Sequence, residues 1–367
     1  MGVDLRGDVR AGWWRGTGLP GPSGLGTAAA RLVGPRRAVT RDGDGLDGCA
    51  PFRVDEPLGR EINAMLLAWA ERIGLYEGHL DYLEQCDFGR YAMLTHPNTD
   101  DRDRLFLAGK SMAALFALDD YYVDDVRAGA TLDQVARRLS VAMSAVDRPF
   151  LTDRYDRHTE QAMKADPVLV ALRDYIDHTA RYATPQQVAR VRHEDLALFV
   201  AMAQESNWHM RKEVAPVWEY LGSRQANSFT PCTTLIDIVD GYELSHDLYS
   251  HPPVRRAVKL AGLITVLVND LHSARKESGA GVFQFGVREA IAAEEGCSFE
   301  EAHVRGVNLH NELMAGFDAQ CRDLTRFATP QLGLFLTGLE AWLAGNREWH
   351  RSSGRYHGTP TDSGSGK

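Results

Sequence analysis

The sequence predicts an all-α fold, a single helical bundle, for most of this 367-residue chain. From Pro57 onward, apolar residues recur at spacings of three and four, which is the period of one helix face. The first such stretch contains Ile62, Met65, Leu66, Trp69 and Ile73. Strand-like alternation of apolar and polar residues is rare. We therefore expect about ten to twelve helices.

Helix-start signals separate the apolar stretches and order the helices along the chain. They are Asp100–Asp103 before Leu105, Thr131 with Asp133 before Val135, Asp166-Pro167, Thr184-Pro185, and Ser298 with Glu301. Asp, Ser and Thr side chains accept hydrogen bonds from the first amides of a helix, and Pro fits its first turn. No linker rich in Gly, Pro or Ser divides residues 55–356, so we expect one helical domain there.

The two ends of the chain have a different composition. Residues 1–50 hold 12 of the 34 glycines and little periodic pattern, so they bury too little surface to offset the entropy of ordering. We expect a disordered N-terminal arm over residues 1–50 and a disordered tail over residues 357–367. Residues 21–32 (GPSGLGTAAARL) are less random, which fits either a short docking peptide or a plain linker.

Charge and hydropathy exclude several classes of partner. The formal net charge is −9, which provides no basic field for a nucleic-acid backbone. No apolar run approaches the ~20 residues of a membrane span, and residues 1–20 lack the apolar centre of a secretory signal. We expect a cytoplasmic protein without nucleic-acid partners.

An acidic run follows the apolar stretch Leu105–Leu118. Asp119–Asp125 reads DDYYVDD, which places four carboxylates near the C-terminal end of a predicted helix. The helix dipole disfavours them there, and like charges four apart, as at Asp120 and Asp124, repel each other. The run therefore suggests a bound cation, for which Mg²⁺ with its preference for oxygen ligands is the best candidate. A solvated helix end is the alternative.

A second polar motif follows the apolar stretch 257–268. Asn269, Ser273 and Glu277 lie four residues apart, so on a helix an amide, a hydroxyl and a carboxylate share one face. All three are oxygen donors, which again favours Mg²⁺. A wet helix face is the alternative for this motif taken alone.

Taken together, the two motifs resemble those of the class I terpene cyclase family. That family also carries a diphosphate-sensing Arg about 45 residues before the second motif, where this chain has Arg224, and a C-terminal Arg-Tyr pair, here Arg355-Tyr356. The resemblance implies a helical bundle with a central active-site cavity, three Mg²⁺ ions and an isoprenoid diphosphate substrate. The usual DDxxD motif would need an acid at Val123, so the acid is shifted to Asp124. The implied metal ligands are Asp119, Asp120, Asp124, Asn269, Ser273 and Glu277.

Four shorter stretches resemble the 2-methylisoborneol synthase branch of that family. They are Leu94–Asp101 (LTHPNTDD), Tyr182–Val188 (YATPQQV), Pro216–Leu221 (PVWEYL) and Asp240–Leu244 (DGYEL). This resemblance implies cyclisation of 2-methylgeranyl diphosphate to 2-methylisoborneol. It further implies that residues 21–32 load the enzyme into an encapsulin shell, and it is compatible with a homodimer.

Ionisation of such a substrate needs positive charge and donors around the leaving diphosphate. The candidate catalytic residues are Arg224, Lys276, Arg355 and Tyr356. For Arg224, the alternative is that it caps a helix or pairs with a surface acid such as Glu219. Substrate-binding candidates are the aromatic residues Phe116, Tyr122, Trp208, Phe229 and Trp349, together with Asn227 and Ser228 at a helix break that Pro231 favours. For each aromatic residue, ordinary core packing is the alternative.

Other functions fit the sequence less well. Chain-elongating prenyltransferases carry two Asp-rich motifs, and the second is replaced here by Asn269–Glu277. An inert helical adaptor, or shell cargo without activity, would not need the two polar motifs together with Arg224 and Arg355. Zinc hydrolysis lacks an HExxH pattern. Within terpene cyclisation, the open alternatives are 2-methylenebornane as product and geranyl or farnesyl diphosphate as substrate.

Overall fold

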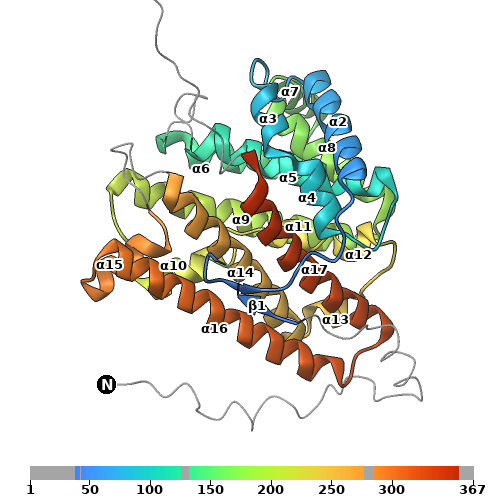
Figure 1. Ribbon diagram of the computed structural model, residues 1–367. Coiled ribbons are helices and arrows are strands. Elements are labelled where there is room, and N and C mark those ends of the chain that lie inside the picture. Colours follow the sequence, from blue (N-terminus) through green and yellow to red (C-terminus); the bar gives the residue numbers. More distant parts are fainter. Residues whose placement is uncertain (1–37, 42, 125–131, 277–284, 355–367) are drawn as a thin grey trace, which may run out of the picture.

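Helices make up nearly all of the regular structure in the computed structural model, which describes residues 38–41, 43–124, 132–276 and 285–354 (Figure 1). The α-helices are α2 (Glu56–Ile73), α3 (Leu80–Cys86), α4 (Phe88–Thr95), α5 (Arg102–Asp119), α6 (Val135–Val146), α7 (Asp153–Lys164), α8 (Pro167–Tyr182), α9 (Pro185–Arg211), α10 (Val217–Arg224), α11 (Thr230–Thr233), α12 (Ile236–Val239), α13 (His246–Ser250), α14 (Pro252–Lys276), α15 (Val287–Glu295), α16 (Phe299–Thr325) and α17 (Pro330–Ser352). The shorter elements are a π-helical turn η1 (Asp120–Asp124), a 3₁₀ turn η3 (Leu132–Gln134) and the antiparallel strands β1 (Thr40–Arg41) and β2 (Asp47–Gly48). The all-α prediction is confirmed.

Most of the predicted helix starts are confirmed by their caps. The Asp101 and Asp166 carboxylates accept hydrogen bonds from amides in the first turns of α5 and α8. Thr184 and Ser298 form capping boxes at the starts of α9 and α16. The start predicted at Thr131 lies outside the described residues.

The described part of the chain forms more helices than the sequence predicted. Between α2 and α5 the chain turns at Asp87, whose φ of 51° separates α3 from α4. After α10 it forms α11, α12 and α13, which have four or five residues each. A spacing of three and four does not reveal such ends, because the apolar pattern continues across them.

A hairpin over residues 38–50 corrects the predicted boundary of the N-terminal arm. The backbone amide of Asp47 donates to Asn311 on α16 (2.8 Å), and Arg347 on α17 donates to the carbonyl oxygen of Leu46 (2.6 Å). The hairpin therefore lies against the C-terminal helices (Figure 1). Asn311 lies 264 positions after Asp47 in the sequence, and Arg347 lies 301 positions after Leu46, so local composition could not reveal these contacts.

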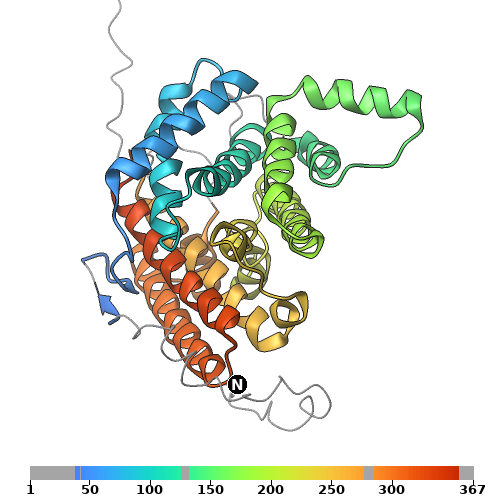
Figure 2. The same cartoon turned by 90° about the vertical axis from the view of Figure 1, so that its right-hand side faces the viewer.

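Two clusters of buried apolar side chains form the core. The larger joins α2–α9, α11–α13, α17 and the C-terminal half of α16 with the N-terminal half of α14. The smaller joins α10, α15 and the N-terminal half of α16 with the C-terminal half of α14. The two C-terminal helices α16 and α17 lie on one side of the bundle, and α7 and α8 lie on the other (Figure 2). Among the described helices, none is both long and apolar enough to cross a membrane.

Candidate active site

The acidic run leaves α5 through a π-helical turn rather than a continuing α-helix. Hydrogen bonds in a π-helix join residues five apart, one more than in an α-helix, and such turns are frequent at functional sites. The backbone positions of Asp119 and Asp124 therefore stand one turn apart, as residues four apart do in an α-helix. Val123, at the fifth position of a DDxxD pattern, is buried in the core. The wider turn explains how the chain accommodates the shifted acid.

The carboxylate of Asp120 is held by two tyrosines from the segment after α2. The hydroxyl groups of Tyr76 and Tyr82 donate to its Oδ2 at 2.6 and 3.2 Å. The Asp119 and Asp120 side chains are both partly exposed, unlike the buried residues that precede them on α5. The end of α5 therefore presents carboxylates to a space outside the core.

The described part of the second polar motif, Asn269 and Ser273, lies on α14, as predicted. Asn269 and Ser273 are partly exposed and lie one turn apart. The amide nitrogen of Asn269 is 3.4 Å from Nε2 of His350, whose Nδ1 lies 2.9 Å from the carbonyl oxygen of Asn346. That carbonyl requires a proton on Nδ1, so Nε2 accepts from Asn269. The contact uses the amide nitrogen and not the oxygen that would bind a cation.

Arg224 ends α10 and faces α14, where it pairs with the motif rather than with Glu219. Its Nη2 donates to Oδ1 of Asp270 at 2.6 Å, and its Nη1 lies 4.0 Å from Glu205 on α9. The Tyr220 hydroxyl donates to the other oxygen of Asp270. Burial alone would lower the pKa of Arg224, but the Asp270 carboxylate outweighs it and raises the pKa, so the guanidinium stays charged.

The predicted helix break after Arg224 is confirmed. The chain leaves α10 there and starts α11 only at Thr230. Within the break, the buried Asn227 donates its amide to Glu205, and the Ser228 hydroxyl contacts Thr230 Oγ1 at 2.8 Å. Both side chains are therefore fixed beside Arg224.

Three of the predicted aromatic residues meet in one cluster. The ring centroid of Phe116 lies 5.8 Å from that of Phe229 and 6.2 Å from that of Trp349. Phe88 and Tyr91 of α4 complete the cluster, with centroids 5.9 and 4.9 Å from Trp349. Sequence reasoning missed these two because no polar motif stands near them. The aromatic cluster, defined by these five residues, lies among α4, α5, α17 and the helix break.

The structure does not bring Tyr122 and Trp208 into the aromatic cluster. The Tyr122 hydroxyl donates to Asp166 at the start of α8 (2.5 Å), and burial followed by that hydrogen bond raises its pKa. Trp208 packs in the smaller core cluster, 5.0 Å from Phe285 between ring centroids. Both contacts match ordinary core packing.

Several predicted features lie outside the described residues. They are the side chains of Asp124 and Lys276, residues Glu277, Arg355 and Tyr356, the peptide 21–32, and the tail 357–367. Within the described part, a cavity of about 220 Å³ lies between the hairpin and α14, α16 and α17. None of the predicted site residues lines it.

Besides Phe88 and Tyr91, and the tyrosines that bind Asp120 and Asp270, three further residues of the site were not predicted: Glu205, Asp270 and His350. Asp270 stands next to Asn269 in the motif itself, so the motif could have indicated it. Glu205 and His350 lie on α9 and α17 without any distinguishing pattern. Only the packing of these helices against the break and α14 reveals them.

Comparison with known proteins agrees with this geometry. Residues 110–315 match the family model described as terpene synthase family 2, C-terminal metal binding. The 2-methylisoborneol synthase of Saccharopolyspora erythraea is 36% identical over 312 residues, 84% of this chain and 88% of that protein. The one from Streptomyces griseus is 35% identical over 91% of this chain and 78% of that protein.

Solved structures give the same result. The crystal structure of 2-methylisoborneol synthase from Streptomyces coelicolor A3(2) in complex with Mg²⁺ and 2-fluoroneryl diphosphate is similar to this chain with a TM-score of 0.80. Its sequence is 32% identical, and the match covers 88% of this chain and 98% of that one. This chain therefore belongs to the terpene synthase family, within its 2-methylisoborneol synthase branch.

Proposed function

We propose that this class I terpene cyclase ionises 2-methylgeranyl diphosphate and cyclises the cation to 2-methylisoborneol. The observation that carries the proposal is similarity to 2-methylisoborneol synthases at more than a third identity over most of the chain. The aromatic cluster adds physical support, because it adjoins the break that follows Arg224 and includes a residue one turn before Asp120.

The side chains on α5 and α14 fit Mg²⁺. Asp119 and Asp120 offer carboxylates, and Asn269 and Ser273 offer an amide oxygen and a hydroxyl, all of them hard donors. Asp124 and Glu277 complete the proposed set, which we expect to hold three ions. When bound, Mg²⁺ supplies positive charge that stabilises the leaving diphosphate.

Arg224 is the described residue best placed to bind the diphosphate. Its guanidinium is mostly buried, charged and paired with Asp270, one residue from Asn269. A guanidinium can donate two parallel hydrogen bonds to phosphate oxygens, which orients the leaving group as well as neutralising it. Lys276, Arg355 and Tyr356 are proposed as further donors.

Phe116, Phe229 and Trp349 are proposed to surround the hydrocarbon chain. Their faces can stabilise a nearby cation by roughly 1–2 kcal/mol each when water is excluded. Asn227 and Ser228 are proposed to bind substrate from the break beside them. Capture of the bornyl-type cation by one water gives the alcohol, whereas proton loss would give 2-methylenebornane.

Incubation of the purified enzyme with Mg²⁺ and each of geranyl, 2-methylgeranyl and farnesyl diphosphate tests the proposal. We expect the highest kcat/KM with 2-methylgeranyl diphosphate and 2-methylisoborneol as main product. A higher kcat/KM with farnesyl diphosphate, or 2-methylenebornane as main product, would contradict it. Omitting Mg²⁺ is the control and should abolish turnover.

We further propose that the enzyme is a cytoplasmic homodimer loaded into an encapsulin shell through residues 21–32. Because the hairpin starts at residue 38, the matching deletion is residues 1–37. It should abolish loading into a co-expressed cognate shell and leave turnover unchanged, whereas deleting residues 358–367 should affect neither. Light scattering tests the dimer, whose mass should be about twice 40.7 kDa.

A further inference from the structure

The segment after the helix break carries part of the candidate site but has little stability of its own. Helices α11 and α12 have four residues each, whereas an isolated helix needs about 12–15 residues to be even marginally stable in water. Phe229, directly before α11, lies 5.8 Å from Phe116 and 6.2 Å from Tyr91 between ring centroids. The position of Phe229 therefore depends on tertiary contacts that hold the residues after it.

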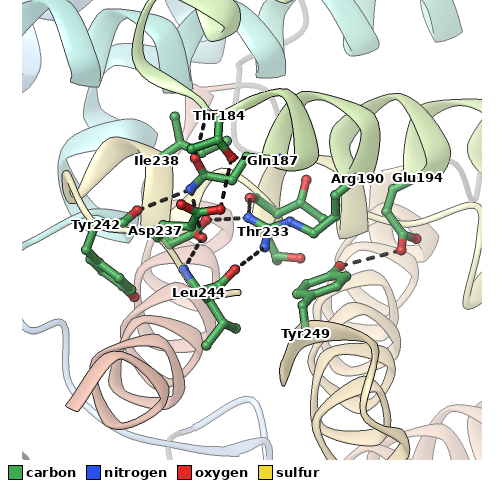
Figure 3. Close-up of polar contacts among 12 residues, drawn as sticks. Thr184, Gln187, Arg190, Glu194, Thr233, Asp237, Ile238, Tyr242, Leu244 and Tyr249 are labelled. Carbon is green, nitrogen blue, oxygen red and sulfur yellow. Dashed lines mark hydrogen bonds and ion pairs between the residues drawn. The ribbon is translucent and has the colours of Figure 1, made fainter. Parts of the chain in front are cut away.

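Arg190 on α9 and Asp237 on α12 supply the main contact on one side of this segment (Figure 3). Nη2 of Arg190 donates to Oδ1 of Asp237 and to the carbonyl oxygen of Thr234, 3.0 Å away and just after α11. Nη1 reaches the carbonyl oxygen of Leu244 at 3.4 Å. The two charged side chains are only 4% and 0% exposed. One guanidinium therefore binds the chain on both sides of α12.

Gln187, one turn before Arg190, completes this contact. Its Nε2 donates to Oδ2 of Asp237 at 2.9 Å, and the backbone amide of Leu244 donates to the same oxygen at 2.9 Å. Both oxygens of the buried carboxylate are thereby bonded (Figure 3). Gln187 lies in the stretch 182–188 and Leu244 in the stretch 240–244, so Asp237 joins two stretches that are far apart in the sequence.

Helix α14 also packs against this segment. A Cβ atom at Gly262 would come within 2.6 Å of Thr230 Oγ1 and 3.0 Å of Ser228 Oγ. A glycine is therefore required for α14 to approach the break this closely. The short segment is therefore held by close packing against Gly262 on α14 and by hydrogen bonds from Arg190 on α9.

We propose that Arg190 and Asp237 are positioning residues for the cyclisation, because they fix α11 and α12 and thereby place Phe229 and Ser228 beside the substrate. The inference rests on the proposed cyclase function. A buried ion pair gives little net stability compared with apolar residues of the same shape, but its hydrogen bonds define one position. A shift of about 1 Å in a group that contacts the reacting cation changes its reactivity. Loss of the pair should therefore alter the product ratio more than the rate of ionisation.

Asp237→Asn tests this role, because it keeps the shape of the side chain and removes its charge. The matched control is Glu194→Gln, on the same helix as Arg190. It removes a buried charge that pairs with the partly exposed Arg255 of α14 (2.6 Å), and within the described residues Glu194 forms no hydrogen bond or ion pair with α11 or α12. The full-length enzymes are incubated with 2-methylgeranyl diphosphate and Mg²⁺, and products and released pyrophosphate are quantified. For Asp237→Asn we expect at least about a threefold larger share of by-products, with kcat/KM for pyrophosphate release within about tenfold of wild type. Glu194→Gln should keep the wild-type ratio.

Gly262→Ala provides a second variant in case Asp237→Asn does not fold. Its added methyl group would displace Thr230 and Ser228 from α14, and it should increase the share of the same by-products. Wild-type product ratios in every folded variant at the two positions would overturn the positioning role. A wild-type enzyme that forms no cyclic product from any of the three diphosphates would instead contradict the proposed function, so the two failures are distinguishable.

Discussion

Arg190 and Arg224 each form a buried ion pair, and the two pairs differ in how completely the carboxylate is enclosed. Asp237 is fully buried and accepts from Arg190, Gln187 and a backbone amide. Asp270 accepts from Arg224 and Tyr220, and its side chain and that of Arg224 are 6% and 12% exposed. The hydrogen bonds to both oxygens of Asp237 hold the Arg190–Asp237 pair in one geometry. The Arg224–Asp270 pair stands at the candidate site, where a diphosphate can take over donors of Arg224.

The largest expected difference between the pairs is in stability. Asp237→Ala leaves Arg190 buried without its counter-charge and should lower the free energy of unfolding by about 3–5 kcal/mol. Asp270→Ala should lower the free energy of unfolding by less than Asp237→Ala does, because Arg224 is more exposed than Arg190 and still has Glu205 nearby. Urea denaturation without Mg²⁺ measures both values. Equal losses would remove the proposed distinction.

The proposed metal ligands should affect activity more than stability. Asn269→Ala, Ser273→Ala and Glu277→Ala should each lower kcat/KM by more than about a hundredfold, since each removes an oxygen donor and little core volume. Thermal unfolding should be unchanged in Ser273→Ala and Glu277→Ala, whereas Asn269→Ala also removes the hydrogen bond to His350. Arg256→Ala, at an exposed position on the same helix, is the control. Near wild-type kcat in all three variants would contradict the metal site on α14.

A smaller effect is expected for Arg224→Lys, which keeps the charge but loses the planar pair of donors. A lost hydrogen bond to a charged group costs roughly 1.5–3 kcal/mol, so kcat/KM should fall by about ten- to a hundredfold. Calorimetry with pyrophosphate and Mg²⁺ should show weaker binding, whereas Glu219→Gln should bind as wild type. Equal affinity in Arg224→Lys would remove Arg224 from the diphosphate site.

Asp195 sharpens the contrast with Asp237, because it is a buried carboxyl for which the described residues provide no ion pair. Burial raises the pKa of Asp195 to about 8, with the Tyr175 hydroxyl as its hydrogen-bond donor. The folded state therefore keeps a proton that the unfolded chain releases near pH 4, and the stability contributed by Asp195 is lost as pH rises from about 4 to 8. As pH rises from about 4 to 8, the free energy of unfolding of Asp195→Asn should increase relative to that of wild type by on the order of a few kcal/mol. A constant difference in urea midpoints from pH 5 to 8.5 would contradict this assignment.

The sequence by itself determined the helical class, most helix starts and the polar motifs. Caps such as Thr184 and apolar spacing act within a few residues, so they can be read locally. The positions of Asn269 and Ser273 on one face follow from the same regular period. The break after Arg224 was also predictable, from the resemblance and from Pro231.

Only the tertiary structure decided which of these groups meet. The hairpin is ordered by α16 and α17, and the Arg224–Asp270 pair joins residues 46 positions apart. Tyr122 and Trp208 pack away from the aromatic cluster, although their sequence positions near the motifs favoured it. Helix periodicity and helix caps depend on interactions within a few residues, so they can be recognised in the sequence. Contacts between side chains on different helices depend on how whole helices pack, which no local pattern encodes.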